Sequence, residues 1–295
     1  MKTHSTVSVL IPAYNAAGCV SRAIESALAQ TLPALEILVV DDGSADDTAH
    51  VVAGYGSPVR LLRQANAGPA AARNHAAREA RGEWLALLDA DDAWLPRKLE
   101  RQLPFTGDER VGVVHCWGPP GGGQAPDQIT FESLWERNCI VNSSALVRRA
   151  AFQAVGGFDE DRALISVEDY NLWLRLLSVG WNVATCPEQL HEYTPAPGNL
   201  SRQFERFARA ELTNLAKLER LPEVTPEMVR RKRIAIYEEY GRHLFHYREL
   251  GAARRWLSFP LRNEPSPQRL AWWLATFAPP AVLDWRRRQG QSVSA

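Results

Sequence analysis

Two hydrophobic periodicities alternate along the first third of the chain. Short unbroken apolar runs predict buried strands, and the segments between them place apolar residues at helical spacing. Regular alternation of strands and helices requires right-handed crossovers and gives a mainly parallel sheet flanked by helices, which is an α/β fold. The predicted strands are residues 7–11, 36–40, 59–62 and 84–88, and the predicted helices are residues 18–30, 46–55 and 69–81.

Polar clusters follow three of the four predicted strands. Ligands of a parallel sheet bind beyond the carboxyl ends of its strands, so these clusters mark the expected site. The cluster residues are Pro12, Tyr14 and Asn15 after the first strand, Asp41 and Asp42 after the second, and Asp89, Ala90, Asp91 and Asp92 after the fourth.

The last of these clusters places three carboxylates within four positions, at Asp89, Asp91 and Asp92. Like charges this close raise one another's pKa unless a cation neutralises them. A divalent cation with oxygen ligands, Mg²⁺ or Mn²⁺, is one interpretation. The alternative is a helix cap and first-turn acids, with the helix opening near Trp94.

Two other features also have two interpretations. The run from Asp41 to Ser44 either forms an ordinary turn, with Gly43 at positive φ, or offers a carboxylate to the imide N–H of uracil or thymine. Arg73, in the predicted helix 69–81, either pairs with a diphosphate or is solvated on an exposed helix face.

Charge is distributed unevenly, although 34 basic residues balance 34 acidic ones. Residues 230–288 contain 13 Lys and Arg but only 5 Asp and Glu, and the pattern after residue 201 is helical. Basic residues around Trp272, Trp273 and Trp285 suit an anionic membrane surface. A helical bundle with a solvated basic rim is the alternative. Nucleic acid is not expected as a partner, because no recognised binding module accompanies the charge.

Several features predict a cytoplasmic protein. If it contacts a membrane, we expect it to bind peripherally at the cytoplasmic face. No apolar run approaches the roughly 18 residues of a transmembrane helix, and we expect no signal peptide at the N-terminus. The four cysteines are far apart and form no CxxC pair, so neither disulfides nor a zinc site is expected. They are Cys19, Cys116, Cys139 and Cys186.

Four motifs together, at residues 9–15, 36–44, 66–74 and 88–92, resemble the family 2 glycosyltransferases of the GT-A fold. The resemblance covers roughly residues 6–200. It implies inverting transfer of a sugar, with UDP the commonest carrier in the family, to a hydroxyl of a glycan or lipid-linked acceptor in cell-surface polysaccharide synthesis. The implied catalytic domain is residues 1–201, with a nucleotide-sugar half at about 1–117 and an acceptor half at about 118–201. A helical extension follows at 202–295.

The resemblance also implies a role for each motif residue. By this resemblance the nucleobase of the donor lies against Pro12, Tyr14 and Asp41, and its ribose lies against Asp89. The divalent cation binds Asp91, with Asp92 a weaker ligand. The family's Glu-Asp pair corresponds to Glu168 and Asp169, where Asp169 is the expected base and Glu168 orients the acceptor. First-turn acids of a helix are the alternative. The full nucleotide-sugar set is Pro12, Tyr14, Asn15, Asp41, Asp42, Arg73, Asn74, Asp89 and Ala90.

One position departs from the family pattern. Many relatives place a metal-ligating His where this chain has Ala196, and His191 cannot be assumed to replace it. We therefore expect weaker metal affinity, with diphosphate and water completing the coordination shell. A non-catalytic nucleotide-sugar-binding protein stays open as an alternative. A nucleotidyltransferase is less favoured, because residues 12–20 lack a Gly-rich phosphate loop with basic residues.

Overall fold

The computed structural model describes residues 5–118, 128–194 and 204–279. The chain divides into two compact units. The first comprises Met1–Asn199 with Leu221–Glu223, and the second comprises Leu200–Arg220 with Val224–Ala295. Each unit has its own architecture.

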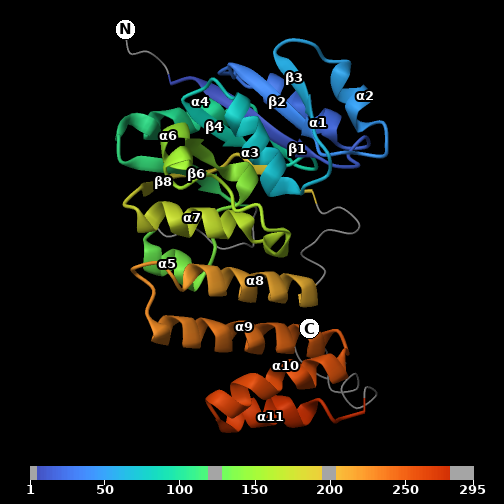
Figure 1. The fold of residues 1–295 in the computed structure, drawn as a ribbon, viewed down its shortest axis with the longest axis vertical. Coiled ribbons are helices and arrows are strands. Elements are labelled where there is room, and N and C mark those ends of the chain that lie inside the picture. The colour runs from blue at the N-terminus through green and yellow to red at the C-terminus, as the bar shows by residue number, and fades with distance from the viewer. Residues whose placement is uncertain (1–4, 119–127, 195–203, 280–295) are drawn as a thin grey trace, which may run out of the picture. The chain divides into compact units, whose positions relative to one another are not determined.

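A seven-stranded sheet forms the centre of the first unit, in the order β3-β2-β1-β4-β7-β6-β8 (Figure 1). The four N-terminal strands are parallel, β7 is antiparallel to both of its neighbours, and β8 is parallel to β6. The mainly parallel sheet predicted from the sequence is confirmed. The strands are β1 (Val7–Ala13), β2 (Glu36–Asp41), β3 (Val59–Arg63), β4 (Trp84–Leu87), β6 (Val111–Trp117), β7 (Leu146–Arg148) and β8 (Asn182–Gln189).

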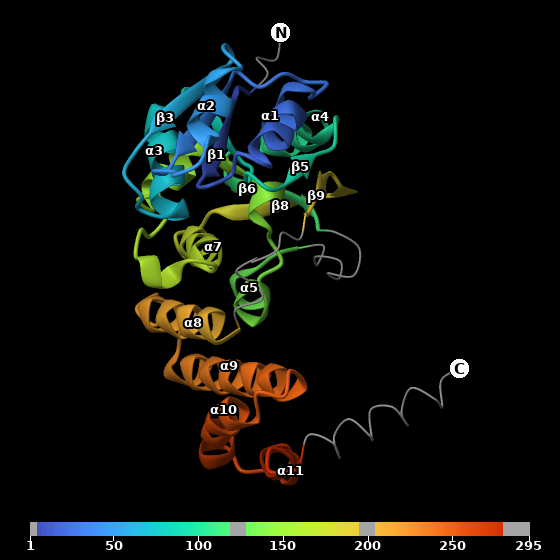
Figure 2. The ribbon, with the colours of Figure 1, turned by 90° about the vertical axis from the view of Figure 1, so that its right-hand side faces the viewer.

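Helices cover both faces of this sheet, with α1 and α4 on one side and α3 on the other (Figure 2). A separate two-stranded ladder pairs β5 with β9 in antiparallel fashion. The remaining elements of the unit are α1 (Val20–Leu28), α2 (Thr48–Ala53), α3 (Pro69–Glu79), β5 (Ala93–Trp94), α4 (Lys98–Gln102), α5 (Phe131–Glu136), α6 (Arg149–Ala154), α7 (Glu168–Ser178) and β9 (His191–Glu192), with short 3₁₀ turns at Leu103–Gly107, Asn142–Ser144 and Arg162–Leu164.

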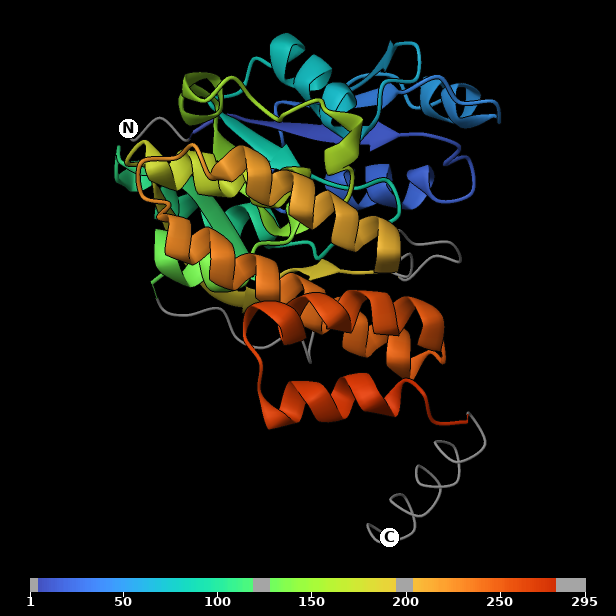
Figure 3. The same ribbon diagram turned by 60° about the horizontal axis from the view of Figure 1, so that its bottom comes forward.

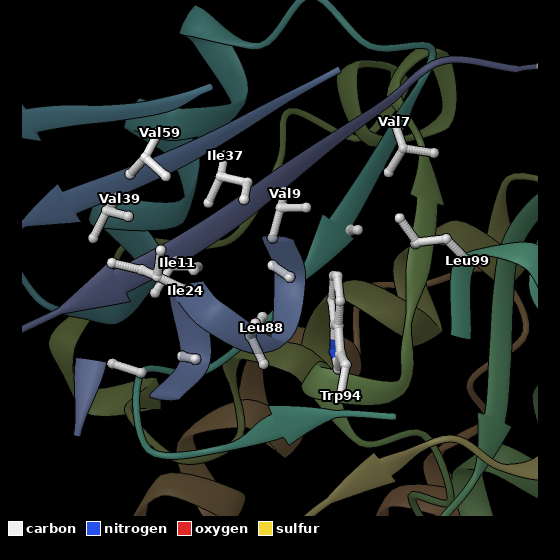
Figure 4. Close-up of a cluster of buried hydrophobic side chains, with 14 of the residues drawn as sticks. Val7, Val9, Ile11, Ile24, Ile37, Val39, Val59, Leu88, Trp94 and Leu99 are labelled. Carbon is white, nitrogen blue, oxygen red and sulfur yellow. The ribbon is translucent and has the colours of Figure 1, made fainter. Parts of the chain in front are cut away.

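Alternate side chains of β1 and β2 enter a continuous apolar core under α1 (Figure 4). Val9 and Ile11 of β1 and Ile24 of α1 are completely buried there. The intervening Leu10 and Leu38 are buried as well, because α3 packs against the same strands from the opposite face. Burial on both faces explains the unbroken apolar runs in the sequence.

The sheet order creates a switch point beside β1. The chain passes from β1 outward through β2 to β3 and then returns to the other side of β1 as β4. Connections on opposite sides of β1 leave a crevice between the carboxyl ends of β1 and β4. Both ends carry predicted site residues, Tyr14 after β1 and Asp89 after β4.

The second unit is helical throughout its described part, as the sequence predicts (Figure 3). Its helices are α8 (Phe204–Leu218), α9 (Pro226–His246), α10 (Leu250–Asn263) and α11 (Pro267–Ala275). Helix α9 packs against both α8 and α10, and α10 packs against α11. On α9, Ile234, Tyr240 and Leu244 are buried. Within the described residues, no helix has the length and apolarity needed to cross a bilayer.

A close contact before β4 provides a test of this packing. A Cβ atom on Gly82 would lie 2.5 Å from the backbone nitrogen of Ser8 in β1. We expect Gly82→Ala to lower the free energy of unfolding by about 1–3 kcal/mol, because the clash is with backbone. Denaturant unfolding measures this effect. Gly107→Ala is the control, since nothing lies within 4 Å of its Cβ position, and equal effects of the two substitutions would contradict the packing.

Candidate active site

The loops after β1 and β2 lie side by side at the carboxyl edge of the sheet. Ala13, the last residue of β1, is the register partner of Asp41, the last residue of β2. The Asn15 backbone N–H donates to Ser44 Oγ (2.9 Å), and the Asn15 amide oxygen accepts from the Ala45 N–H (2.9 Å). Asn15 has a φ of 49° and therefore turns the first loop onto the second. Its observed contacts fasten two loops of the predicted donor side together.

Asp41 and Asp42 have different surroundings, although both are buried. Asp41 accepts from the Ser44 N–H (3.0 Å), and its other oxygen lies 3.5 Å from Arg63 Nε. Gly43 takes a φ of 73°, as a turn at this place requires. The sheet register brings Asp41 next to the loop that carries Tyr14, whose side chain is exposed.

Both oxygens of the Asp42 carboxylate accept hydrogen bonds from a single loop. Its Oδ1 accepts from Gln64 Nε2 and from the Ala67 N–H, each at 2.8 Å, and its Oδ2 accepts from the Gly68 N–H at 2.8 Å. A carboxylate with this many donors has little capacity left for a ligand. Asp42 thus anchors the segment that leads into α3, and its predicted contact to the nucleotide sugar stays a prediction.

Arg73 on α3 connects the donor side of the crevice to helix α7. Its Nη2 donates to Asp89 Oδ1 (2.6 Å), and its Nη1 donates to Glu168 Oε1 (2.8 Å). Only 3% of Arg73 is exposed. Burial alone would lower the pKa of Arg73, but the two carboxylates raise it above its ordinary value. The interpretation of Arg73 as a solvated helix residue is therefore wrong, whereas its pairing with a diphosphate stays a prediction.

Asn74, the next residue on α3, is bonded to the backbone before α7. Its Nδ2 donates to the Phe158 carbonyl (2.9 Å), and its Oδ1 accepts from the Phe158 N–H (2.9 Å). A Cβ on Gly157 would lie 2.6 Å from this Oδ1, and Gly157 has a φ of 76°. The amide of Asn74 is therefore bonded to protein groups, and its predicted contact to the nucleotide sugar stays a prediction.

Glu168 holds the backbone at the start of α7. Only 5% of the residue is exposed; its Oε1 accepts from Arg73, and its Oε2 accepts from the Ser166 N–H (2.8 Å). Ser166 has a φ of 91°, a conformation that residues with side chains rarely adopt and that needs support from its surroundings. The Glu168 carboxylate supplies this support and is thereby committed on both oxygens.

Asp169 lies half-buried in the first turn of α7, beside Glu168. Its Oδ1 accepts from the Tyr170 N–H (2.6 Å). Burial raises the pKa of Asp169 above the ordinary aspartate value, and the neighbouring charge of Glu168 raises it further. A carboxylate with a raised pKa is a stronger proton acceptor once ionised, so Asp169 is suited to general-base chemistry.

Ser143 organises the acidic cluster after β4. Its Oγ accepts from the Asp89 N–H (3.1 Å) and donates to Asp92 Oδ2 (2.6 Å). The Thr194 N–H donates to the other Asp92 oxygen (3.3 Å). The sequence offered only a polar Asn142–Ser144 run as a signal for Ser143, and its pairing with a cluster 51 residues away was missed.

The two predicted cation ligands, Asp91 and Asp92, have different surroundings. Asp92 is almost completely buried and bonded to protein groups, and burial with the charge of Asp89 raises its pKa to about 7. Asp91 is less buried, and within the described residues no side chain forms an ion pair or hydrogen bond with its carboxylate. Burial and the nearby Asp89 raise the pKa of Asp91. A carboxylate that lacks a cation partner beside a second carboxylate fits Mg²⁺ or Mn²⁺.

Two further positions bear on the ligands expected for this cation, His191 and Ala196. No cluster of three or more His, Cys, Asp or Glu suited to a metal occurs in the part of the chain that the structure describes. His191 is completely buried, its Nδ1 lies 3.7 Å from Cys116 Sγ, and burial lowers its pKa to about 4. Ala196 lies outside the described residues. We therefore expect Asp91 to bind the cation, with diphosphate and water as the further ligands.

The acids after β4 are not first-turn residues of a helix. They are followed by strand β5, and α4 begins only at Lys98. The helix-cap interpretation of Asp89, Asp91 and Asp92 is therefore wrong. Glu168 and Asp169 do lie in the first turn of α7, as that alternative states. Glu168 also contacts Arg73 and Ser166.

A comparison with protein families identifies the chain. The model described as "Glycosyl transferase family 2" matches residues 8–155, just over half of the sequence. The chain belongs to glycosyltransferase family 2. A further model, "Glycosyltransferase like family 2", matches residues 124–222. The family resemblance seen in the sequence motifs is confirmed.

Curated relatives of this family 2 glycosyltransferase match its N-terminal part. An uncharacterized glycosyltransferase of Rickettsia felis is 32% identical over 196 residues, covering 59% of this chain and 31% of that protein. The Escherichia coli protein WfgD, named a UDP-Glc:alpha-D-GlcNAc-diphosphoundecaprenol beta-1,3-glucosyltransferase, is 33% identical over 180 residues, covering 58% and 69%. The Rhizobium meliloti succinoglycan biosynthesis protein ExoO is 38% identical over 164 residues, covering 55% and 44%. The chain thus spans about a third of the length of the Rickettsia felis relative.

Solved structures with the same fold include two glycosyltransferase complexes. The mannosyltransferase PcManGT of Pyrobaculum calidifontis, in complex with GDP-Man and Mn²⁺, gives a TM-score of 0.66 at 22% identity, covering 92% of this chain and 79% of that one. TarS 1-349 of S. aureus, in complex with UDP-GlcNAc, gives a TM-score of 0.63 at 18% identity with the same coverage. These likenesses confirm the GT-A fold.

Removal of Arg73 tests its bridge in this family 2 glycosyltransferase. We expect Arg73→Met to lower the free energy of unfolding by about 3–5 kcal/mol, because Asp89 and Glu168 would be left without their cation. Denaturant unfolding measures the change. The matched control is Arg78→Met on the same helix, where the side chain is exposed and 4.0 Å from Glu160; its effect should stay within about 0.5 kcal/mol. Similar losses in both variants would contradict the bridge.

Proposed function

We propose that the chain is an inverting glycosyltransferase that moves a sugar from a nucleoside diphosphate sugar to an acceptor hydroxyl. The observation that carries this proposal is the division of labour around Arg73. Arg73 neutralises Asp89 and Glu168, whereas Asp91 and Asp169 are not among its hydrogen-bond partners. One carboxylate is thereby available for a cation and another for a proton.

Inversion requires attack on the anomeric carbon from the side opposite the leaving nucleotide, with a base at the attacking hydroxyl. Asp169 is the group that we assign to this base. Its raised pKa makes it a better acceptor for the hydroxyl proton than an ordinary aspartate, and Glu168 holds the start of its helix through Ser166. Glu168 therefore acts by positioning Asp169, since both of its oxygens are already occupied.

Asp91 is the residue that would hold the divalent cation. A bound Mn²⁺ or Mg²⁺ supplies electrostatic stabilisation of the charge that develops on the departing diphosphate. The protein's part is to keep the Asp91 carboxylate in place, and the neighbouring Asp89 and Asp92 do this through Arg73 and Ser143. The support for Asp91 is that Asp92 is already bonded to Ser143 and Thr194, whereas no side chain within the described residues pairs with Asp91.

For the donor we propose a UDP-sugar bound at Pro12, Tyr14 and Asp41. The E. coli relative is named for UDP-Glc, and TarS is in complex with UDP-GlcNAc. PcManGT is in complex with GDP-Man, so a GDP-sugar is the competing donor. A thermal-shift screen of UDP-, GDP- and dTDP-sugars with and without Mn²⁺ separates these donors.

For the acceptor we propose a glycan hydroxyl on a lipid-linked carrier, in polysaccharide synthesis. The support is the names of two relatives: the E. coli enzyme acts on a GlcNAc-diphosphoundecaprenol, and the Rhizobium protein is a succinoglycan biosynthesis protein. The cytoplasmic location expected from the cysteines stays a prediction. A non-catalytic donor-binding protein is the alternative, which turnover measurements on purified protein distinguish.

Substitution of the proposed base tests catalysis directly. We expect Asp169→Asn to lower kcat by about 10²–10⁴ and to leave donor affinity unchanged, because the base contacts the acceptor hydroxyl rather than the nucleotide. Sugar transfer from labelled UDP-sugar measures kcat, and calorimetry measures UDP affinity. Asp47→Asn, an exposed aspartate before α2, is the control and should retain full turnover. Normal turnover of Asp169→Asn would remove Asp169 from this role.

The pH dependence of turnover provides an independent test of Asp169. Its pKa is raised above the ordinary value of about 3.9, and only the ionised form accepts a proton. We therefore expect kcat to rise with pH and to be lost on the acid side at a pH well above 4. The measurement is a kcat profile at saturating substrates. An acid limb at the ordinary aspartate value would show that the raised pKa of Asp169 does not control turnover.

Substitution of Asp91 tests the cation assignment. We expect Asp91→Asn to abolish the Mn²⁺-dependent part of UDP binding, because a neutral amide is a poor ligand for a hard cation. Calorimetric titration of UDP with and without Mn²⁺ measures this. Asp92→Asn is the control: an amide oxygen can still accept from Ser143 Oγ or Thr194 N–H, so the Mn²⁺ dependence should remain. Mn²⁺-dependent binding in Asp91→Asn would contradict the assignment.

A further inference from the structure

Helix α11 attaches to the second unit through one face. Arg269 donates to Glu238 Oε2 (3.0 Å) and to the Glu264 carbonyl oxygen (2.7 Å). The Trp272 ring meets Phe245 edge-on, with ring centroids 5.3 Å apart. Thr276, directly after the helix, is buried. Residues 269, 272 and 276 follow helical spacing, so these contacts define a single inner face.

The opposite face of α11 is apolar and exposed. Leu270, Leu274 and Phe277 have exposed fractions of 45%, 53% and 52%. Their spacing of four and three residues places them in one stripe, away from Arg269, Trp272 and Thr276. None of the residues of α11 itself is buried. Leu270 and Leu274 of α11, together with Phe277 just beyond its end, form the exposed apolar surface that we call the α11 stripe.

Arg254 places a cation beside the α11 stripe, and residues 250–279 contain no acid without an ion-pair partner. The guanidinium of Arg254 lies 3.6 Å from the ring centroid of Phe277, a member of the stripe. Arg255 and Arg262 on α10 are exposed and form no ion pair with the described residues. Glu264 is the only acid in residues 250–279, and it is neutralised by Arg230 and Arg269. The α10–α11 region therefore combines exposed apolar surface with uncompensated positive charge.

We propose that the α11 stripe docks on the surface of an anionic lipid bilayer. An interfacial helix binds through an apolar face inserted at the headgroup boundary, with arginines beside it for anionic lipid. The stripe offers such a face, and Arg254 places a cation at its edge.

The residues that carry this docking differ from those that the sequence suggested. Trp272 packs on the inner face, and Trp273 is half-buried with its ring against Phe277 at 4.9 Å. Trp285 lies outside the described residues. The aliphatic and phenyl side chains of the stripe therefore take the place of the tryptophans as the contact surface.

Vesicle flotation of the full chain tests the proposal without turnover. We expect the protein to float with vesicles of phosphatidylcholine and phosphatidylglycerol at low salt, and to float at least about tenfold less with pure phosphatidylcholine or at high salt. The triple variant Leu270→Ser, Leu274→Ser, Phe277→Ser should lose at least about tenfold of the bound fraction, because the inserted apolar area is removed.

A matched control removes exposed apolar side chains elsewhere. Leu35→Ser combined with Val179→Ser changes two exposed residues of the first unit and should float like the wild type. Far-UV circular dichroism and unfolding midpoints should be the same for all variants, since every substituted side chain is exposed. Absence of flotation by the wild type, or undiminished flotation of the folded triple variant, would overturn the proposal. A wild-type dimer that the triple variant abolishes, without flotation of either, would assign the stripe to a second copy of the chain instead.

Discussion

The buried guanidinium of Arg73 is the interaction on which the candidate site depends. It joins Asp89, 16 residues away at the end of β4, to Glu168, 95 residues away at the start of α7. Arg73 and Glu168 have almost no access to water, and Asp89 is partly exposed. Loss of Arg73 would leave the buried charge of Glu168 unpaired. The contact couples the predicted nucleotide-sugar half of the domain to the helix that carries the proposed base.

Around this bridge, six acidic side chains have distinct surroundings despite similar positions at the edge of the sheet. Asp42 and Asp92 are bonded to backbone or hydroxyl groups and serve the loops. Asp89 and Glu168 share Arg73. Asp91 and Asp169 combine a raised pKa with a carboxylate that pairs with no other side chain within the described residues, whereas Asp92, whose pKa is also raised, is bonded to Ser143. Environment, rather than residue type, therefore separates structural from chemical roles among these acids.

Much of the fold follows from local patterns in the sequence. The apolar runs that became β1 and β2 are unbroken because helices cover both faces, and their ends were recognisable from the polar residues that follow. The partners of those polar residues were not predictable. Asn74 meets Phe158 across 84 residues, and Ser143 meets Asp92 across 51. No local propensity encodes such contacts, because they arise only when distant loops converge on the same edge.

The support that Glu168 gives to Ser166 limits how this domain can be recombined. Ser166 keeps its unusual backbone angle while a carboxylate accepts its N–H, and that carboxylate is oriented by an arginine from the other half. A chimera that grafts the acceptor half of a relative onto this chain must bring a residue able to meet Arg73 in the same way. Engineering of acceptor specificity is therefore best confined to segments that leave the Arg73–Glu168–Ser166 chain of contacts intact.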